Sequence, residues 1–281
     1  MWERRSKTIF WSTVLLSGFI FFQMIMHASH LTFHWSPGFN IFEICSSWIQ
    51  SLGLSFAVYL MNALVICTLL HCCWLAVKQA YLVRRAVVRL ERSRNEELTQ
   101  KVTERYRLNQ GSIIVTDHSE AVAMTMGFVR PQIVISAGLI QLINEAELEA
   151  VLLHEQYHLT KRHPFKSFLT LWFSSSLWFI PILSWWHRYY KITLEVLADK
   201  FAIQVKGAET DLGSALLKLM KRNQASIQAA HSAFADTSVN YRIKHMIDPE
   251  AELKFHLPWH HQLLSYLVII FLTGLFVLLG R

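Results

Sequence analysis

Residues 152–163 read LLHEQYHLTKRH, and residues 165–186 read FKSFLTLWFSSSLWFIPILSWW. The first stretch combines three histidines with a glutamate. The second stretch is apolar enough to leave water and enter a lipid bilayer. A fold that satisfies both must hold a cluster of polar, ionisable side chains beside a membrane.

The composition lies between that of a soluble globular protein and that of a many-helix transporter. Of 281 residues, 53% are hydrophobic and 17% are charged, and the mean hydropathy is +0.28. We therefore expect a mainly α-helical membrane protein that combines a few membrane helices with a polar domain of independent size. The four cysteines form no C-x-x-C pair, so we assign them neither a metal nor a disulfide.

Three apolar runs are long enough to cross a bilayer core, which takes about 20 helical residues. None contains Asp, Glu, Lys or Arg, and they cover residues 8–26, 52–77 and 263–279. Basic residues precede the first run as in a signal peptide, but no small-residue cleavage site follows, so we interpret it as an uncleaved helix. The chain thus divides into a transmembrane hairpin (1–77), a polar domain (78–262) and a C-terminal transmembrane helix (263–281).

The distribution of basic residues predicts the orientation of these helices. The segments before Thr8 and after Val77 are strongly basic, whereas the loop over residues 27–51 contains no Lys or Arg. By the positive-inside rule, the N-terminus and residues 78–262 face the cytoplasm, and the loop and the C-terminus lie outside. Topology explains the basic segment after Val77, so no direct contact with nucleic acid is predicted.

The polar domain begins with helical and then β-type periodicity. Residues 78–109 are predicted to be helical, with a solvated or packed face; a repressor-binding surface is the alternative. From Gly111 the pattern changes to short β-rich runs of a small sheet. Pro131 lies in the last run and favours a position at the margin of the sheet, because proline is tolerated on edge strands or at bulges. Asn144 and Glu147 then form a capping-box pattern that predicts the start of a helix.

That helix carries the motif H-E-x-x-H, formed by His154, Glu155 and His158. Residues four apart lie on one face of a helix, so both imidazoles can reach a single Zn²⁺. Glu155 is rotated by about 100° and can take a proton from a water molecule at the metal, which is the chemistry of peptide hydrolysis. The pentapeptide also arises by chance, so the prediction requires a third ligand.

The apolar-periodic stretch ITLEVLADKFAI, residues 192–203, supplies that ligand. Glu195 completes a two-His, one-Glu set with the fourth zinc position open, and Asp199 can accept the free N–H of a zinc-binding histidine. Two solvated acids are the alternative, but the upstream motif favours one Zn²⁺ per chain. His163 follows two basic residues at the end of its helix, and we interpret it as a solvated or dipole-stabilised histidine rather than a ligand.

The apolar run over residues 165–186 must return to the side of the membrane from which it starts. If it crossed once, Glu195 could not meet the two histidines. Ser174–Ser176 and Pro181 offer break points, and each arm is too short to span about 30 Å. We predict a membrane-dipping helical hairpin; an ordinary fourth span is the alternative, and it would divide the site between two compartments.

Several of these stretches together resemble a known family. AMTMGFVRPQIVIS, AELEAVLLHEQYHL, EVLADKFAI and YRIKHMI occur in this order over roughly residues 112–250. They are similar to the integral-membrane zinc metallopeptidases of the beta-lactam sensor-transducer type, the penicillinase-repressor and methicillin-resistance regulators. The related heat-shock and prenyl-protein membrane proteases look similar as well. The order of strand, zinc helix, apolar hairpin and ligand helix is more specific than any single motif.

The resemblance implies a cytoplasmic α+β domain of the gluzincin class in the inner membrane of a bacterium. The implied ligands are His154, His158 and Glu195, and the implied base is Glu155. A small edge sheet ahead of the zinc helix would bind the substrate as an added strand. That edge is either the Pro131 strand or the run Ala121, Val122, Ala123, Met124 and Thr125. A plain sheet edge is the alternative for either strand.

Two further implications concern Arg242 and the sensor. Arg242 matches an arginine that would polarise the substrate carbonyl, although an arginine beside Tyr241 and Lys244 is also typical of a surface. No S-x-x-K or K-T-G motif of a penicillin-binding domain occurs before Arg281, so we expect that sensor domain to be lacking and a separate sensor protein to supply the signal.

The leading hypothesis is a multi-pass membrane zinc metalloendopeptidase that cuts a protein substrate, which the resemblance suggests is a cytosolic transcriptional repressor. Two alternatives stay open. One is a quality-control protease of damaged membrane proteins, and the other is a non-catalytic scaffold braced by zinc. Besides membrane lipid, a protein substrate is the partner we expect; the sequence predicts no oligomeric state.

Overall fold

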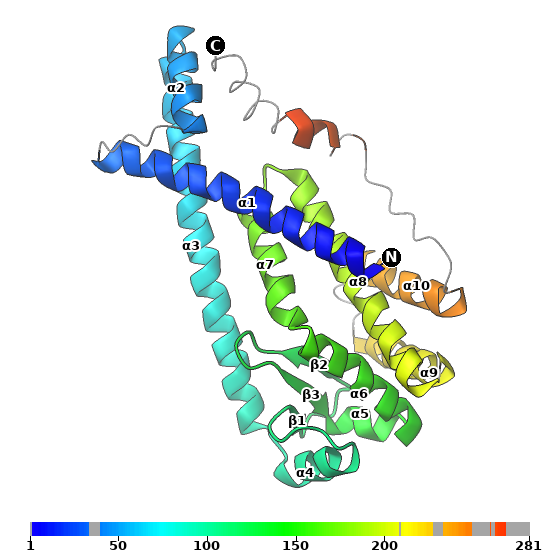
Figure 1. The fold of residues 1–281 in the computed structure, drawn as a ribbon. Helices are drawn as coiled ribbons and strands as arrows, with labels where there is room; N and C mark the ends of the chain where they lie inside the picture. Colours follow the sequence, from blue (N-terminus) through cyan, green and yellow to red (C-terminus); the bar gives the residue numbers. More distant parts are fainter. Residues whose placement is uncertain are drawn as a thin grey trace. The chain divides into compact units, whose positions relative to one another are not determined.

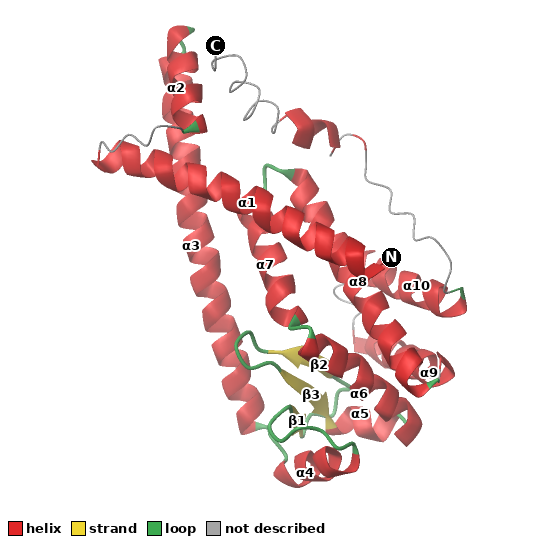
Figure 2. Cartoon of the chain, in the orientation of Figure 1, coloured by secondary structure: helices red, strands yellow, loops and turns green. Residues whose placement is uncertain are grey.

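The computed structural model describes residues 2–33, 40–207, 209–226, 233–248, 259 and 262–267. These residues are mostly helical, with one three-stranded sheet among them (Figures 1 and 2). The chain divides into two compact units. The sheet unit comprises Met1–Ser6, Tyr81–Phe168 and Arg188–Lys254, and the helical unit comprises Lys7–Ala80, Leu169–His187 and Phe255–Arg281.

Among the described residues, two helices are long and apolar enough to cross a membrane. They are α1 (Trp2–Phe33) and α3 (Ser55–Arg92), whose most apolar 18-residue windows have mean hydropathies of 1.8 and 2.0. They contain the predicted run 8–26 and most of the run 52–77. Beyond residue 267, the predicted third run over 263–279 lies outside the described residues.

A short helix, α2 (Ile41–Ser51), lies in the predicted outer loop and is fixed to α1 by amide side chains. Asn40 caps α2, because its side-chain oxygen accepts from the backbone N–H of Phe42 at 2.8 Å. Its amide nitrogen donates to the carbonyl oxygen of Gln23 at 3.1 Å, and the Gln23 side chain accepts from Ile41 N at 3.1 Å. The buried backbone groups at this helix start are therefore paired.

The apolar run over 165–186 reverses direction. Helix α7 (His163–Ser176) ends before the turn and α8 (Pro181–Lys206) begins after it. Proline suits the first helical position, where no N–H is needed. Thr170 and His187, on the two arms, lie 2.9 Å apart through Oγ1 and Nδ1, and Trp172 Nε1 donates to the carbonyl oxygen of Cys72 on α3 at 3.0 Å. These arms pack with α1, α2 and α3 around one apolar core: Ile20, Phe21, Met24, Phe42, Val65, Cys72, Phe173, Leu177, Ile180 and Leu183.

The helix predicted over 78–109 is two helices in the structure. Helix α3 ends at Arg92 and α4 (Glu96–Arg105) follows. Asn95 caps α4 by accepting from Leu98 N at 2.9 Å, and its own backbone N–H donates to the carbonyl oxygen of Val115 at 2.8 Å. A continuous helix was wrong because asparagine competes for backbone donors and favours a cap over a helix interior.

The sheet contains β1 (Ile113–Thr116), β2 (Ala123–Met126) and β3 (Gln132–Ser136) in the order β1-β3-β2. Strand β3 pairs with β1 in parallel and with β2 in antiparallel orientation, so β3 is central and β2 is an edge. The position predicted for the Pro131 run was therefore wrong. Pro131 precedes Gln132, the first paired residue, and so removes no N–H from the ladder.

Helix α6 (Glu145–Thr160) follows the short helix α5 (Ala137–Leu142) and packs on β2, β3 and α9 (Glu209–Ser226), as Figure 1 shows. Its predicted capping box is confirmed: Asn144 accepts from Glu147 N, and the Glu147 side chain accepts from Asn144 N. Glu147 also accepts from Ser214 at 2.6 Å and from Lys218 at 2.7 Å on α9. Burial alone raises the pKa of Glu147, but these hydrogen bonds lower it below its ordinary value.

The core beneath α6 is apolar and almost fully buried. It joins side chains of β1, β3, α5, α6 and α9: Ile113, Val115, Ile133, Ile135, Leu139, Leu148, Val151, Leu152 and Ala215. This packing fixes the rotation of α6, so that His154 and His158, on a different face from Leu148, lie against residues of α8.

Candidate metal centre

Helix α6 brings His154 and His158 together, one turn apart. Their Nε2 atoms lie 3.1 Å from each other and their rings meet edge to face, with centroids 4.8 Å apart. Both are buried, with exposed fractions of 5% and 8%. Two imidazole nitrogens at this distance, deep in the protein, point at one position in space.

Helix α8 adds a carboxylate to this pair. Glu195 Oε2 lies 3.5 Å from His154 Nε2, and Glu195 Oε1 lies 3.7 Å from His158 Nε2. One candidate ligand atom from each of these three residues can be chosen so that all three lie within 4.8 Å of one another. The structure therefore brings together the three residues that the sequence spacing predicted as metal ligands.

Asp199, one turn along α8 from Glu195, contacts the other side of His154. Its Oδ1 lies 2.7 Å from His154 Nδ1, and the carboxylate is 2% exposed. In the neutral ring, a proton on Nδ1 beside this carboxylate leaves the lone pair of Nε2 toward the cluster. Burial lowers the pKa of His154, but Asp199 and Glu195 outweigh burial and raise it to about 9.

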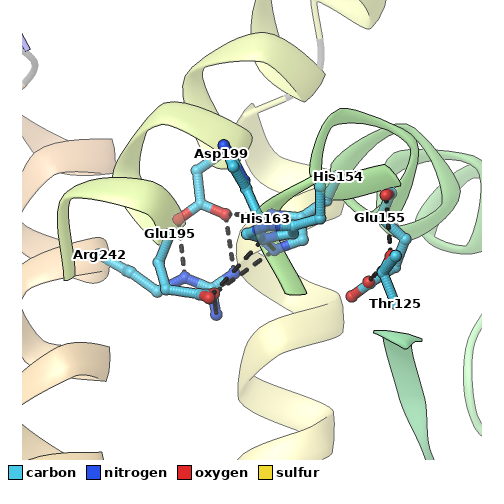
Figure 3. A network of polar contacts seen from close by, with 8 residues as sticks. Thr125, His154, Glu155, His163, Glu195, Asp199 and Arg242 are labelled. Atoms are coloured by element: carbon cyan, nitrogen blue, oxygen red, sulfur yellow. Dashed lines mark hydrogen bonds and ion pairs between the residues drawn. The ribbon is translucent and has the colours of Figure 1, made fainter. Parts of the chain in front are cut away.

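Arg242, on α10 (Ala233–Ile247), forms a two-pronged ion pair with Asp199. Its Nε donates to Oδ2 and its Nη2 donates to Oδ1, both at 2.7 Å, and its Nη1 lies 3.3 Å from Glu195 Oε2 (Figure 3). The Arg242 side chain is 13% exposed. Burial opposes its charge, but Asp199 and Glu195 raise the pKa of Arg242, so the guanidinium stays charged and committed to these carboxylates.

The ionisable groups around the cluster carry a net negative charge that a cation can balance. Burial raises the pKa of Glu195, but His154, His158 and Arg242 hold it well below its ordinary value, and Arg242 and His154 likewise lower that of Asp199. With Glu155, the site has three carboxylates and one guanidinium. Neutral imidazoles then give it a formal charge of minus two, which a divalent cation would balance.

Glu155 lies on the other side of the histidines from Arg242 and is held by a threonine of β2 (Figure 3). Thr125 Oγ1 lies 2.7 Å from Glu155 Oε2 and 3.0 Å from the Glu155 carbonyl oxygen. Glu155 is 7% exposed. The sequence placed Thr125 only in a strand; its spacing from Glu155 carries no signal for this contact, which requires the sheet to lie against α6.

His163 is the site residue that the sequence interpretation got wrong. It is 6% exposed rather than solvated, and its Nδ1 lies 2.8 Å from His158 Nδ1. Burial, with His158 and Lys166 acting in the same direction, lowers its pKa to about 3. Adjacent basic residues suggested exposure, but the tight turn after α6 brings this ring back against His158.

A cavity of 420 Å³ opens beside these groups within the sheet unit. Its walls include Ala123, Met124 and Thr125 from β2, the histidines and glutamates of the cluster, and Leu212 and Leu216 from α9. Ala121 and Val122, also predicted to belong to the edge strand, come just before β2. The predicted edge is thus adjacent to the cluster and opens onto the same space.

The chain is similar to a known protein family. A family model described as BlaR1 peptidase M56 matches residues 44–247, more than half of the chain. The match includes each residue of the cluster. No curated protein matches the chain.

Proposed function

The chain belongs to the BlaR1 peptidase M56 family, which is a family of membrane-associated metallopeptidases, and we propose that it is a zinc metalloendopeptidase. The observation that carries the proposal is the convergence of two Nε2 atoms and one carboxylate within 4.8 Å, beside the carboxylate of Glu155. The resemblance found in the sequence motifs and the family match support the same class of enzyme.

The donor atoms fit zinc. The contact of Asp199 with His154 Nδ1 favours the neutral tautomer whose Nε2 offers a lone pair to the cluster, and Glu195 faces the same point. Two imidazoles and one carboxylate are a donor set of catalytic zinc sites. Zinc held by His154, His158 and Glu195 supplies Lewis acidity, which polarises a carbonyl and makes a water molecule more acidic.

Glu155 acts as the general base. Its Oε2 accepts the hydroxyl of Thr125 at 2.7 Å, so we assign proton transfer to the other oxygen, Oε1. Glu155 takes the proton of the attacking water at that oxygen and delivers it to the leaving amine nitrogen. Thr125 holds the carboxylate in one rotamer while this happens, since a fixed hydrogen bond removes the freedom to turn away.

Substrate binds along β2 as an added strand. In the antiparallel ladder, Val122 O accepts from Ser136 N at 3.0 Å, so alternate residues from Val122 onward bond to β3. The N–H and C=O groups of Ala123 and Thr125 therefore point away from β3, toward the edge. A peptide that pairs with them lies beside the cavity and the cluster.

A matched pair of proline variants tests this mode of binding. Ala123→Pro removes an N–H that points to the substrate and leaves the bonds to β3 intact, so KM should rise while the protein stays folded. Met124→Pro removes an N–H that bonds to β3, so it should lower stability instead. Equal KM values for Ala123→Pro and wild type would show that no strand adds at this edge.

The site works at the cytoplasmic face of a bacterial inner membrane. Basic residues on either side of the apolar runs support this orientation, and the apolar hairpin over 165–186 would dip into the inner leaflet. By resemblance, the substrate is a cytosolic transcriptional repressor and a separate sensor protein gives the signal. Proteomics of cells carrying Glu155→Gln tests this: one or two stabilised proteins support regulation, whereas many stabilised membrane proteins support quality control.

The catalytic proposal is tested with purified protein in detergent. Glu155→Gln should bind one zinc per chain like the wild type and lose cleavage of a peptide library, because it keeps the ligands and removes the base. Equal cleavage by the two proteins would contradict the role of Glu155. One bound zinc without any cleavage that depends on Glu155 would instead favour a scaffold.

A further inference from the structure

His163 is the first residue of α7 and lies against the zinc helix. Its ring meets that of His158 at 70°, with centroids 4.9 Å apart, and the two Nδ1 atoms lie 2.8 Å from each other. The ring of Tyr157 also packs against it, at 69° with centroids 5.3 Å apart. His163 is thus a buried polar ring that packs against two side chains of α6 and meets one of them, His158, through ring nitrogens. Such a contact has a defined geometry.

The backbone is bent to make this contact. Arg162, just before His163, has a φ of +52°, in the left-handed region that side chains other than glycine rarely adopt. Such a residue costs on the order of 1 kcal/mol. This turn ends α6 and begins α7 within a few residues, which folds His163 back over the ligand His158 instead of toward solvent.

The short distance between the two Nδ1 atoms requires a proton on one of them, and the proposed zinc site decides which one. Two nitrogens 2.8 Å apart share one proton, so one of them donates and the other accepts. If His163 donated, neutral His158 would carry its own proton on Nε2, the atom that faces His154 and Glu195, and could not bind a metal there. If His158 donates, its Nε2 offers a lone pair to the cluster.

We propose that His163 is a positioning residue: its Nδ1 accepts the Nδ1–H of His158 and thereby fixes the tautomer and the ring orientation in which His158 binds the metal. The inference rests on the proposed zinc site. The two histidine ligands then differ in the group that contacts Nδ1: a carboxylate, Asp199, for His154 and a neutral imidazole, His163, for His158. A neutral acceptor keeps the formal charge of the site at minus two, matched to one divalent cation.

The experiment measures zinc affinity by competition with a chelator, together with the visible absorption of the Co²⁺-loaded protein. His163→Leu removes the acceptor and should weaken zinc binding by about 10–100-fold, the range for loss of such partners. His163→Asn restores an acceptor oxygen and should recover most of that loss. The Co²⁺ spectrum should change in His163→Leu and return toward that of the wild type in His163→Asn.

His245→Leu is the matched control. His245 is also 6% exposed in the sheet unit, but its ring contacts Trp2 rather than a ligand. Its zinc affinity should equal that of the wild type. If leucine at position 163 prevents folding, His163→Ala takes its place, with the same loss expected.

Several results would overturn the inference. His163→Leu could bind zinc as tightly as the wild type, or the Leu and Asn variants could lose affinity equally, which would assign His163 to packing alone. An equal loss in His245→Leu would have the same meaning. Wild-type protein that binds no zinc would overturn the proposed function itself, and this inference with it, so the two failures are distinguishable.

Discussion

Replacing Arg242 by methionine separates two roles for this arginine. The sequence motifs suggested that it polarises the substrate carbonyl, whereas the structure pairs it with Asp199 through two hydrogen bonds of 2.7 Å, with 2% of the Asp199 side chain exposed. Hydrogen bonds to charged groups contribute about 1.5–3 kcal/mol each, and removal of one partner of a buried pair costs about 3–5 kcal/mol. We expect Arg242→Met to lower the free energy of unfolding of the metal-free protein by about 3–5 kcal/mol.

The assay is chemical unfolding of the purified protein in detergent, in the presence of a chelator. Arg105→Met provides the control, because Arg105 pairs with Glu145 at the surface with 58% of its side chain exposed. Surface pairs contribute about 0–1 kcal/mol, so this variant should unfold almost like the wild type. Arg242→Met could instead keep wild-type stability and zinc affinity while its kcat alone falls by about 10²–10³. That result is expected of a group that touches the substrate, and it would contradict a structural role for the pair of Arg242 with Asp199.

Three other changes test the elements around the site. Glu147→Gln should lower the free energy of unfolding by about 1.5–3 kcal/mol at neutral pH. Because the pKa of Glu147 is lowered in the folded protein, this difference from wild type should be fully present above the ordinary pKa of 4.5 and should disappear as the pH falls through the folded pKa. Chemical unfolding at a series of pH values measures it. Thr125→Val should lower kcat by about tenfold at unchanged zinc affinity, whereas Thr125→Ser should keep most of the activity, since it retains the hydroxyl that holds Glu155. Gly127→Ala should lower the melting temperature, because Gly127 has a φ of +100° and an added Cβ would lie 2.7 Å from the carbonyl oxygen of Arg130.

The sequence predicted the parts of the site that depend on helix periodicity. His154 and His158 share a face because they are four residues apart, and Glu195 and Asp199 share a face for the same reason. The capping box of Asn144 and Glu147 was equally local. The apolar stretch between the histidine motif and Glu195 then required a chain reversal. One of the predicted break points, Pro181, is the first residue of α8 in the structure.

Contacts between different helices and strands could not be predicted from the sequence. The hydrogen bond from Thr125 to Glu155 joins residues 30 positions apart and depends on how the sheet lies on α6. His163 was interpreted from its basic neighbours, whereas the left-handed turn at Arg162 determines its burial. The strand after Pro131 was predicted at the margin of the sheet because the sequence does not distinguish a proline just before a strand from one inside it. Local patterns fix which residues share a helix face, and packing decides what each one meets.

X-ray absorption at the zinc edge of the purified, zinc-loaded protein would identify the atoms that bind the metal. We expect one zinc per chain with two imidazole nitrogens at about 2.0–2.1 Å and carboxylate oxygen at about 2.0–2.2 Å, and loss of one imidazole in His158→Ala. A shell containing sulfur at about 2.3 Å, or a spectrum that His158→Ala leaves unchanged, would contradict it.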